Sequence, residues 1–210
     1  MSVGGMGGYQ ATLGKIRDSY EAIVSYLDEE TPSGNVINGD AADLPHNANS
    51  IQSVVIDPPY YSSIMYSELS DLYYVWMKEY LEDVFPDTFQ KQLTEKAEEA
   101  VANPSRFNSV SGGSGSKREL ANEHYEEKMS DIFSELYRVL ESGGVMTVMF
   151  THKETDAWDT LTMSLINSGF TITSTHPITS EMPARIDTRG GGSADSTLLL
   201  VGRKPHEERD

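Results

Sequence analysis

The stretch Ser53-Val54-Val55-Ile56-Asp57-Pro58-Pro59-Tyr60 decides the fold of this chain. Its first four residues are mostly β-branched and apolar, which is typical of a buried strand. Two consecutive prolines follow one residue later, and proline has no backbone N–H to donate to a neighbouring strand. The strand is therefore predicted to end at Asp57, with that carboxylate at its carboxyl end.

Helices and strands alternate on both sides of this strand. Apolar residues at helical spacing predict helices at 11–28, 66–81, 87–101, 120–140 and 156–168, and Gly169 closes the last one as a left-handed cap. Further strands are predicted at 35–38, 145–150, 170–177 and 196–203. This order favours an open, largely parallel α/β sheet in a single domain over 1–210, with an antiparallel strand at the sheet edge. Region 82–117, with its Gly- and Ser-rich end, is predicted to be an insertion containing a flexible loop.

The charge of the chain is strongly acidic. Its 33 acidic and 16 basic residues give a formal net charge of −17 over 210 residues. Such a chain is repelled by a polyphosphate, which by itself argues against nucleic acid. The competing hypothesis is a halophilic protein, because in molar salt the Debye length falls to about 3 Å and long-range repulsion largely vanishes. A salt-rich cytoplasm would reconcile the acidic surface with a DNA substrate.

Several classes of protein are disfavoured by composition. The chain has no cysteine, which excludes disulfides, cysteine zinc sites and a thiol nucleophile, and its five histidines lack the spacing of metal ligands. No apolar run approaches the roughly 20 residues that span a bilayer, and the first ten residues lack the pattern of a signal peptide. We therefore expect a cytoplasmic protein without a metal site. The sequence also lacks a Gly-x-Ser-x-Gly motif and a phosphate-binding Walker loop.

The residues from Asp57 to Tyr60 have the chemistry of an amine clamp. An exocyclic aromatic amine is a poor nucleophile because its lone pair is delocalised into the ring. The Asp57 carboxylate and the Pro58 carbonyl can accept hydrogen bonds from the amine and direct its lone pair outward, and Pro59 keeps the backbone rigid. Tyr60 offers a flat face on which an extruded base can stack. The alternative is that the four residues merely form a turn that ends a strand.

Longer stretches of the chain resemble a known family. Asp-Pro-Pro-Tyr after an apolar strand is the signature of amino-group DNA methyltransferases, and the Asp form is typical of adenine-specific ones. The stretches that carry the resemblance are VINGDAADLP, SVVIDPPYYSSIMYSELSDLYYVWMKEYL, SELYRVLESGGVMTVMFTHKETDAW and STLLLVGRK. They are similar to the C-terminal part of archaeal and bacterial adenine-specific DNA methylases, whose longer members carry a zinc ribbon. The resemblance covers nearly the whole chain from about residue 10.

This resemblance implies a Rossmann-like methyltransferase fold, S-adenosyl-L-methionine as cofactor and N6 of adenine in DNA as the methylated atom. Asp57, Pro58, Pro59 and Tyr60 would hold and stack the target base. Asp40, with Ala41 beside it, matches the family's acid near the adenine ring of the cofactor, and the alternative for Asp40 is an Asx turn or a helix cap. Candidate substrate contacts beside the motif are Tyr61, Ser67 and Glu68, although a packed helix face also explains this region.

Two basic segments are further candidates for contacts with the substrate. His152 and Lys153 follow the strand at 145–150 and lie at the end of the sheet where ligands bind in such folds. Arg185 and Arg189 lie in the Gly-rich loop 178–195 and are candidates for DNA phosphate contacts. Exposed loop side chains with no ligand are the alternative for both segments.

One expected feature is missing from the sequence. The methyltransferase fold begins its cofactor site with a glycine-rich loop between the first strand and helix, and no stretch here has that context. The first strand–helix–strand is therefore predicted to be lacking, and we expect a partial domain that a polypeptide encoded upstream completes. Two rival functions stay open: methylation of an amino group on RNA or protein glutamine, and an accessory subunit without catalysis. Relatives of the first kind usually carry Asn in place of Asp57, which favours DNA.

Overall fold

The computed structural model describes residues 8–27, 34–108, 116–152, 155–178 and 197–206. These residues form two compact units, 1–38 and 39–210. The first unit contains helix α1 (Tyr9–Tyr26), close to the helix predicted at 11–28. Its apolar residues Leu13, Ile16 and Tyr20 are exposed. The second unit contains the sheet and the Asp57–Tyr60 motif.

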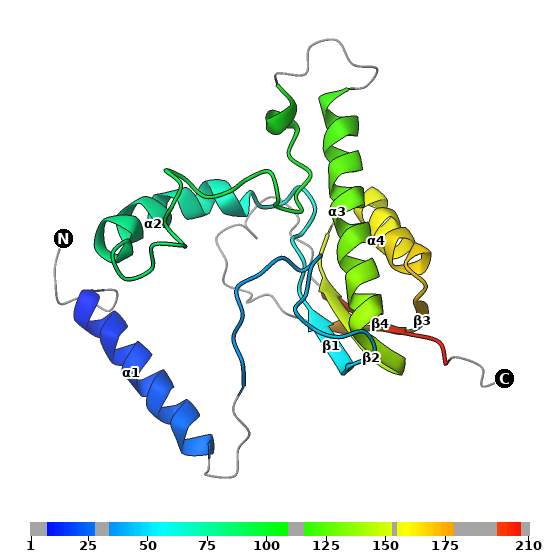
Figure 1. Ribbon diagram of the computed structural model, residues 1–210, viewed down its shortest axis with the longest axis horizontal. Coiled ribbons are helices and arrows are strands. Elements are labelled where there is room, and N and C mark those ends of the chain that lie inside the picture. Colours follow the sequence, from blue (N-terminus) through cyan, green and yellow to red (C-terminus); the bar gives the residue numbers. More distant parts are fainter. Residues whose placement is uncertain (1–7, 28–33, 109–115, 153–154, 179–196, 207–210) are drawn as a thin grey trace. The chain divides into compact units, whose positions relative to one another are not determined.

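The second unit is built on a four-stranded sheet with the order β1-β2-β4-β3 (Figure 1). The strands are β1 (Ile51–Ile56), β2 (Leu140–Phe150), β3 (Thr171–Ile178) and β4 (Thr197–Arg203). β1 is parallel to β2, whereas β4 is antiparallel to both β2 and β3. The predicted α/β class and the antiparallel pair are confirmed. The antiparallel strand itself lies one position in from the edge, and β3 is the edge strand.

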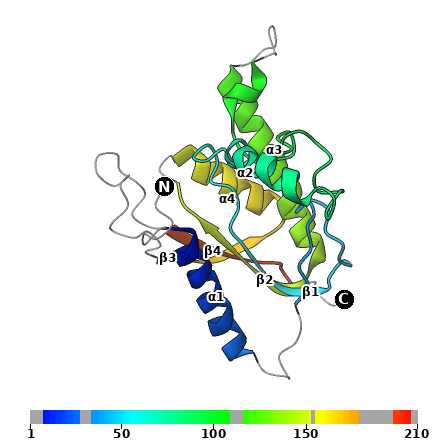
Figure 2. The ribbon, with the colours of Figure 1, turned by 90° about the vertical axis from the view of Figure 1, so that its left-hand side faces the viewer.

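Helix α3 (Lys117–Val139) and helix α4 (Thr155–Asn167) cover one face of this sheet (Figure 2). α3 begins with a capping box in which Ser116 and Glu119 bond each other's backbone N–H. Fully buried side chains of the two helices and of β2 form the core between them, including Met129, Phe133, Met146, Val148, Phe150, Leu161 and Leu165. Gly169 follows α4 with φ +97°, which confirms the predicted left-handed cap.

Strand β2 begins five residues earlier than the predicted strand at 145–150. Its register against β1 shifts, because Ile51 pairs with Leu140 whereas Ser53 pairs with Val145. The extra β2 residues include Gly143, with φ +79°, and the buried Gly144. A Cβ at Gly144 would lie 2.7 Å from the Leu140 side chain and 3.1 Å from a β1 carbonyl oxygen. Gly143 and Gly144 therefore lie within β2, at the point where its register against β1 shifts, and do not precede the strand.

Two predicted elements are wrong. Residues 34–40 form no strand, and Val36 and Ile37 are exposed, so the apolar pair at 35–38 has no strand partner among the described residues. Residues 87–101 form turns where a helix was expected, followed by a short 3-10 helix, η1 (Pro104–Phe107). Helix α2 (Tyr66–Leu81) explains why residues 87–101 do not form a helix. Asp71 of α2 accepts hydrogen bonds from the backbone N and the hydroxyl of Thr94, which draws those donors away from local helical bonds.

The attachment of segment 87–101 to α2 is expected to be acid-sensitive. Hydrogen bonds from Lys96 and Thr94 lower the pKa of Asp71 to about 2. Because this folded-state pKa is below the unfolded one, the stabilisation is present above about pH 4 and is lost as the pH falls toward 2. Asp71→Asn should therefore lower the thermal midpoint at pH 6 and reduce its further fall between about pH 5 and 2.5. Asp159→Asn, which changes an exposed aspartate of α4, is the matched control and should retain the full acid-dependent fall.

Candidate active site at the end of β1

The motif residues leave the sheet at the carboxyl end of β1. The last residue pair of β1 with β2 is Ile56 with Val148, so Asp57 begins the chain beyond the ladder. Asp57 is exposed, Pro58 is buried, and Pro59 and Tyr60 are half-buried. The prolines end the strand as predicted, and the carboxylate lies at the edge where ligands bind in open α/β sheets.

A tight turn after the motif sends two adjacent tyrosines into different environments. Tyr61 has φ +52°, an uncommon left-handed conformation for a residue with a side chain, and its N–H donates to the Pro59 carbonyl at 2.9 Å. The Tyr61 ring is 3% exposed and packs edge-on against Tyr125 at 4.9 Å and His152 at 5.5 Å. Tyr61 thus belongs to the core beneath the motif, whereas Tyr60 is half-buried and packs against the edge of that core.

Tyr60 lies between the motif carboxylate and the end of β2. Its ring contacts Phe150 edge-on, with centroids 5.8 Å apart. Burial, and after it the Asp57 carboxylate, raises the pKa of Tyr60 to about 12, while the Thr151 hydroxyl acts in the opposite direction. The phenol therefore keeps its proton at neutral pH and stays a hydrogen-bond donor.

The two proline carbonyls differ in their partners. The Pro59 carbonyl accepts from the Tyr61 N–H and from the Tyr125 hydroxyl, the latter at 3.2 Å. No hydrogen bond to the Pro58 carbonyl is recorded within the described part of the chain. Pro59 thus holds the turn, whereas Asp57 and the Pro58 carbonyl are two acceptors next to one another in sequence.

Removal of the Tyr125 hydroxyl should loosen this turn. Tyr125 is fully buried on α3, and burial raises the pKa of its phenol, so it donates as a neutral hydroxyl. Tyr125→Phe is expected to lower the free energy of unfolding by about 1 kcal/mol, measured in urea, because the Pro59 carbonyl keeps only its Tyr61 bond. Tyr73→Phe alters an exposed ring of α2 and is the control. Equal losses from both variants would show that the hydroxyl does not hold the turn.

The end of β2 provides a second set of side chains beside the motif. The His152 ring stacks on Phe150 with centroids 6.2 Å apart, and its carbonyl accepts from the Trp158 indole at 2.9 Å. The Thr151 hydroxyl lies 2.5 Å from that of Thr197 at the start of β4. The sequence places Thr151 at the end of its strand but does not predict its contact with Thr197, since only the β2–β4 register shows that the two are neighbours. Lys153, Arg185 and Arg189 lie outside the described residues.

Ser67 and Glu68 take part in a polar network that joins α2 to η1. Ser67 is buried and donates to Glu99, and Arg106 bonds the same Glu99 carboxylate. Glu68 accepts from the Asn103 amide at 2.9 Å and lies 3.5 Å from Arg106. The proposed substrate contacts Ser67 and Glu68 are thus already bonded within the protein. Glu99 and Asn103, which bond Ser67 and Glu68, lie more than 30 residues away from them, so no local pattern could have indicated these bonds.

Asp40 forms the Asx turn that was its alternative interpretation. Its side chain accepts from the Ala42 N–H at 2.9 Å, and its carbonyl accepts from the Asp43 N–H at 3.1 Å. Asp40 and Ala41 are both exposed. The Asx turn engages one oxygen of the Asp40 carboxylate. Because Asp40 is exposed, its carboxylate stays accessible to a ligand.

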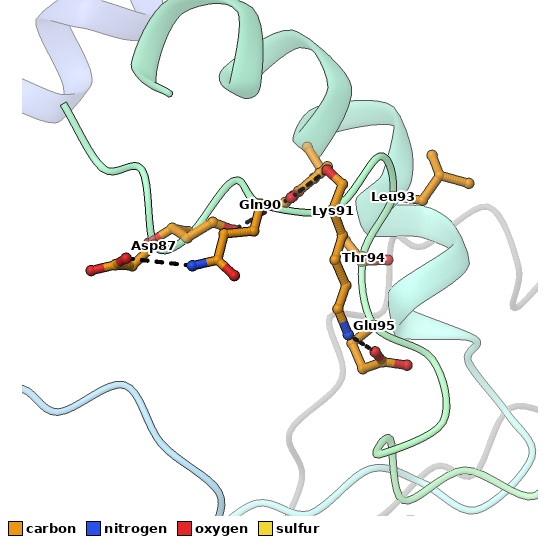
Figure 3. A pocket seen from close by; sticks show the side chains of 8 residues that line it. Asp87, Gln90, Lys91, Leu93, Thr94 and Glu95 are labelled. Atoms are coloured by element: carbon orange, nitrogen blue, oxygen red, sulfur yellow. Dashed lines mark hydrogen bonds and ion pairs between the residues drawn. The ribbon is translucent and has the colours of Figure 1, made fainter. Parts of the chain in front are cut away.

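A pocket of about 220 Å³ lies away from the Asp57–Tyr60 motif, between α2 and residues 87–95 (Figure 3). None of the motif residues lines it. Tyr74 and Lys78 both donate to the Lys91 carbonyl, and Lys91 pairs with Glu95, so many of its polar groups are bonded to one another. The described residues contain no cluster of three or more potential metal ligands. They also contain no helix long and apolar enough to cross a membrane.

No protein-family model and no curated protein matches this chain. Among solved structures, a candidate DNA modification methylase of Thermus thermophilus, complexed with S-adenosyl-L-methionine, matches at 13% identity and a TM-score of 0.42. The match covers 82% of this chain and 54% of that one, so the chain spans about half the length of this relative. A SAM-dependent methyltransferase of Methanosarcina mazei matches at 13% identity, a TM-score of 0.41, and coverage of 91% and 78%. At these TM-scores the likenesses assign no activity to this chain.

Proposed function

We propose that this chain carries the catalytic motif of an S-adenosylmethionine-dependent methyltransferase that acts on N6 of adenine in DNA. One observation supports the proposal most directly. An exposed carboxylate, Asp57, and a carbonyl without a recorded partner, that of Pro58, stand at the end of a parallel strand beside a half-buried tyrosine ring. Two acceptors and one flat ring are what the recognition of an extruded base with an amino group requires.

The motif residues would act on the target amine. Asp57 accepts a hydrogen bond from one amine hydrogen and the Pro58 carbonyl from the other, which turns the nitrogen lone pair out of the base plane. S-adenosylmethionine, when bound, supplies a methyl group on a sulfonium sulfur. The N–C bond forms as the S–C bond breaks, and the amine proton leaves toward Asp57 and then solvent. The negative charge of Asp57 stabilises the positive charge that develops on the nitrogen.

The residues present fit only part of a cofactor site. Asp40 offers an exposed carboxylate to the donor's adenosine, and Ala41 adjoins it. The glycine-rich loop that would hold the rest of the cofactor is not found in the sequence. We infer that a polypeptide encoded upstream supplies it, and that the two polypeptides together bind cofactor and DNA. The missing glycine-rich loop also favours a second candidate function, that of an accessory subunit that no longer catalyses.

The preference for adenine in DNA over other amines rests on Asp57. Relatives acting on RNA or on protein glutamine usually have Asn at this position. The charge of −17 then requires concentrated salt for DNA to approach. The rate of methyl transfer to DNA should accordingly rise by about several-fold as the KCl concentration increases from about 0.2 to 2 M. A DNA-binding enzyme with a positive net charge would lose activity over the same range, because salt weakens its contacts with phosphate.

Calorimetric titration of S-adenosylmethionine into the folded chain, in concentrated KCl, is the first test. We expect no binding by the isolated chain and micromolar binding once the upstream polypeptide is co-expressed. Transfer of labelled methyl groups is then measured separately on adenine-containing DNA, RNA and protein. Labelled DNA supports the proposal. A complex that binds the cofactor yet labels only RNA or protein, or nothing, would overturn it, and the last result would favour the accessory subunit.

A further inference from the structure

The loop that follows the motif is bonded at both ends to one other segment of the chain. Its first residue, Tyr61, accepts a hydrogen bond on its carbonyl from the Ala102 N–H at 3.1 Å. Its last residue, Ser67, donates its N–H to the Glu99 carboxylate at 3.0 Å, and the Ser67 hydroxyl donates to the same carboxylate. The two ends of loop 61–67 are therefore anchored to residues only a few positions apart.

The Glu99 carboxylate acts as a cap for helix α2. The helix begins after Met65, whose side chain makes no capping bond. The first N–H groups of a helix have no acceptor within the helix, and they carry its partial positive charge. Glu99 supplies both an acceptor for the Ser67 N–H, in the first turn, and a negative charge. A residue distant in sequence thus does what the residue before the helix does not.

Arg106 holds the Glu99 carboxylate in place. The guanidinium bonds this carboxylate and lies 3.2 Å from the Ser67 hydroxyl, and the Arg106 and Glu99 side chains are 15% and 11% exposed. Burial of Glu99 opposes its charge, but the hydrogen bonds from Ser67 and Arg106 outweigh burial, so the pKa of Glu99 lies below its ordinary value. Glu99 is therefore ionised at neutral pH and has fixed partners on two elements.

The turn that carries Tyr60 depends on the same anchors. Tyr61 has φ +52°, and a residue with a side chain keeps such a conformation only where its surroundings hold it. The Tyr60 carbonyl accepts from the Ser63 N–H at 2.9 Å, and the Tyr61 carbonyl accepts from Ala102. The second of these bonds comes from the segment that Glu99 attaches to α2.

We propose that Glu99, held by Arg106, is a positioning residue that fixes the loop after the motif and thereby the orientation of the Tyr60 ring. This inference rests on the proposed function and adds to it two residues outside the motif. Glu99 acts through Ser67 and the backbone of the loop and touches neither the base nor the donor. A displaced Tyr60 ring would misplace the stacked base relative to Asp57, and a misplacement of about 1 Å can lower a rate by about a hundredfold.

The first test needs no methyl transfer. Amide hydrogen exchange is measured by NMR on the folded chain with the substitution Glu99→Gln. The exchange of the Ser67 and Ala102 amides should become about tenfold faster relative to that of Val148 in β2, because the loop then opens locally. A loss of global stability alone would accelerate all three amides equally. Glu98→Gln is the matched control, since the Glu98 side chain is 64% exposed, and it should leave these ratios unchanged.

Methyl transfer is then measured in the complex with the upstream polypeptide, well below the thermal midpoint of each variant. Glu99→Gln should lower kcat about tenfold and leave the KM for DNA within about twofold, whereas a role in stability alone would leave kcat unchanged. Arg106→Met should lower kcat to a similar extent, and Arg106→Lys, which keeps a cation beside Glu99, should restore most of it.

Unchanged exchange ratios in Glu99→Gln would overturn the inference, and so would faster local exchange with the wild-type kcat. If the exchange ratios change as expected but the wild-type complex methylates nothing, the fixing of the loop by Glu99 stands and the proposed function fails.

Discussion

Replacing Asp57 with asparagine is expected to reduce kcat for methyl transfer about a thousandfold. The amide keeps an acceptor oxygen and nearly the same shape, but it loses the negative charge that stabilises the methylated, positively charged amine. Asp57 is exposed and lies beyond the β1 ladder, so the fold should not change. The loss is measured as labelled methyl incorporated into DNA, in concentrated KCl, by the chain co-expressed with the upstream polypeptide that the proposal requires.

Two further measurements separate chemistry from binding in this variant. The dissociation constant for S-adenosylmethionine should stay within about twofold of wild type, because Asp57 is assigned to the base and not to the donor. Asp131→Asn removes one exposed negative charge from α3 and serves as the matched control for the change in net charge. If Asp57→Asn keeps more than about a tenth of the wild-type rate, a group other than Asp57 must accept the amine proton. That result would contradict the proposed role of Asp57 in the amine clamp.

The second large effect is expected from Lys204, which is 6% exposed just after β4. Its ammonium donates to the Asn49 side chain at 2.7 Å, the Tyr137 carbonyl at 2.8 Å and the Leu140 carbonyl at 2.9 Å. It also lies 4.5 Å from the Tyr137 ring centroid. One side chain therefore joins the loop before β1, the end of α3 and the start of β2.

Lys204→Met should lower the free energy of unfolding by about 3 kcal/mol, since three acceptors lose a charged donor and methionine fills the space without replacing it. Urea unfolding followed by circular dichroism measures the loss. Arg203→Met is the control, because Arg203 is exposed and its one recorded side-chain bond reaches the Gly143 carbonyl at 3.3 Å. That control should change stability by less than about 0.5 kcal/mol. Comparable losses from both variants would contradict the role of Lys204.

The sequence was most informative where local chemistry determines structure. The β-branched run and the double proline placed β1 and its end correctly, because proline cannot donate to a ladder. Helix α2 was predicted with the bounds that the structure has. Gly169 was correctly assigned as a cap, since its positive φ is a local property of the chain. The roles of Asp57, Pro58 and Tyr60 remain predictions that only activity measurements test.

The sequence was least informative where distant residues meet. Nothing near Thr94 indicates that its donors bond Asp71 of α2, so the helix predicted at 87–101 was wrong. Ser67 gave no sign of its bond to Glu99. The pair Thr151–Thr197 depends on the register between β2 and β4, and register is set by the packing of whole strands.

The position of β4 in the sheet has a consequence for biosynthesis. β3 is made before β4 but has no hydrogen bonds to β2, because β4 lies between them. Until β4 has docked, β3 has no neighbouring strand in the described sheet, and β2 keeps one edge unpaired. Unpaired strand edges are templates for wrong pairing. Because β4 is made near the end of the chain, β3 and β4 are expected to join the sheet together, after synthesis has finished.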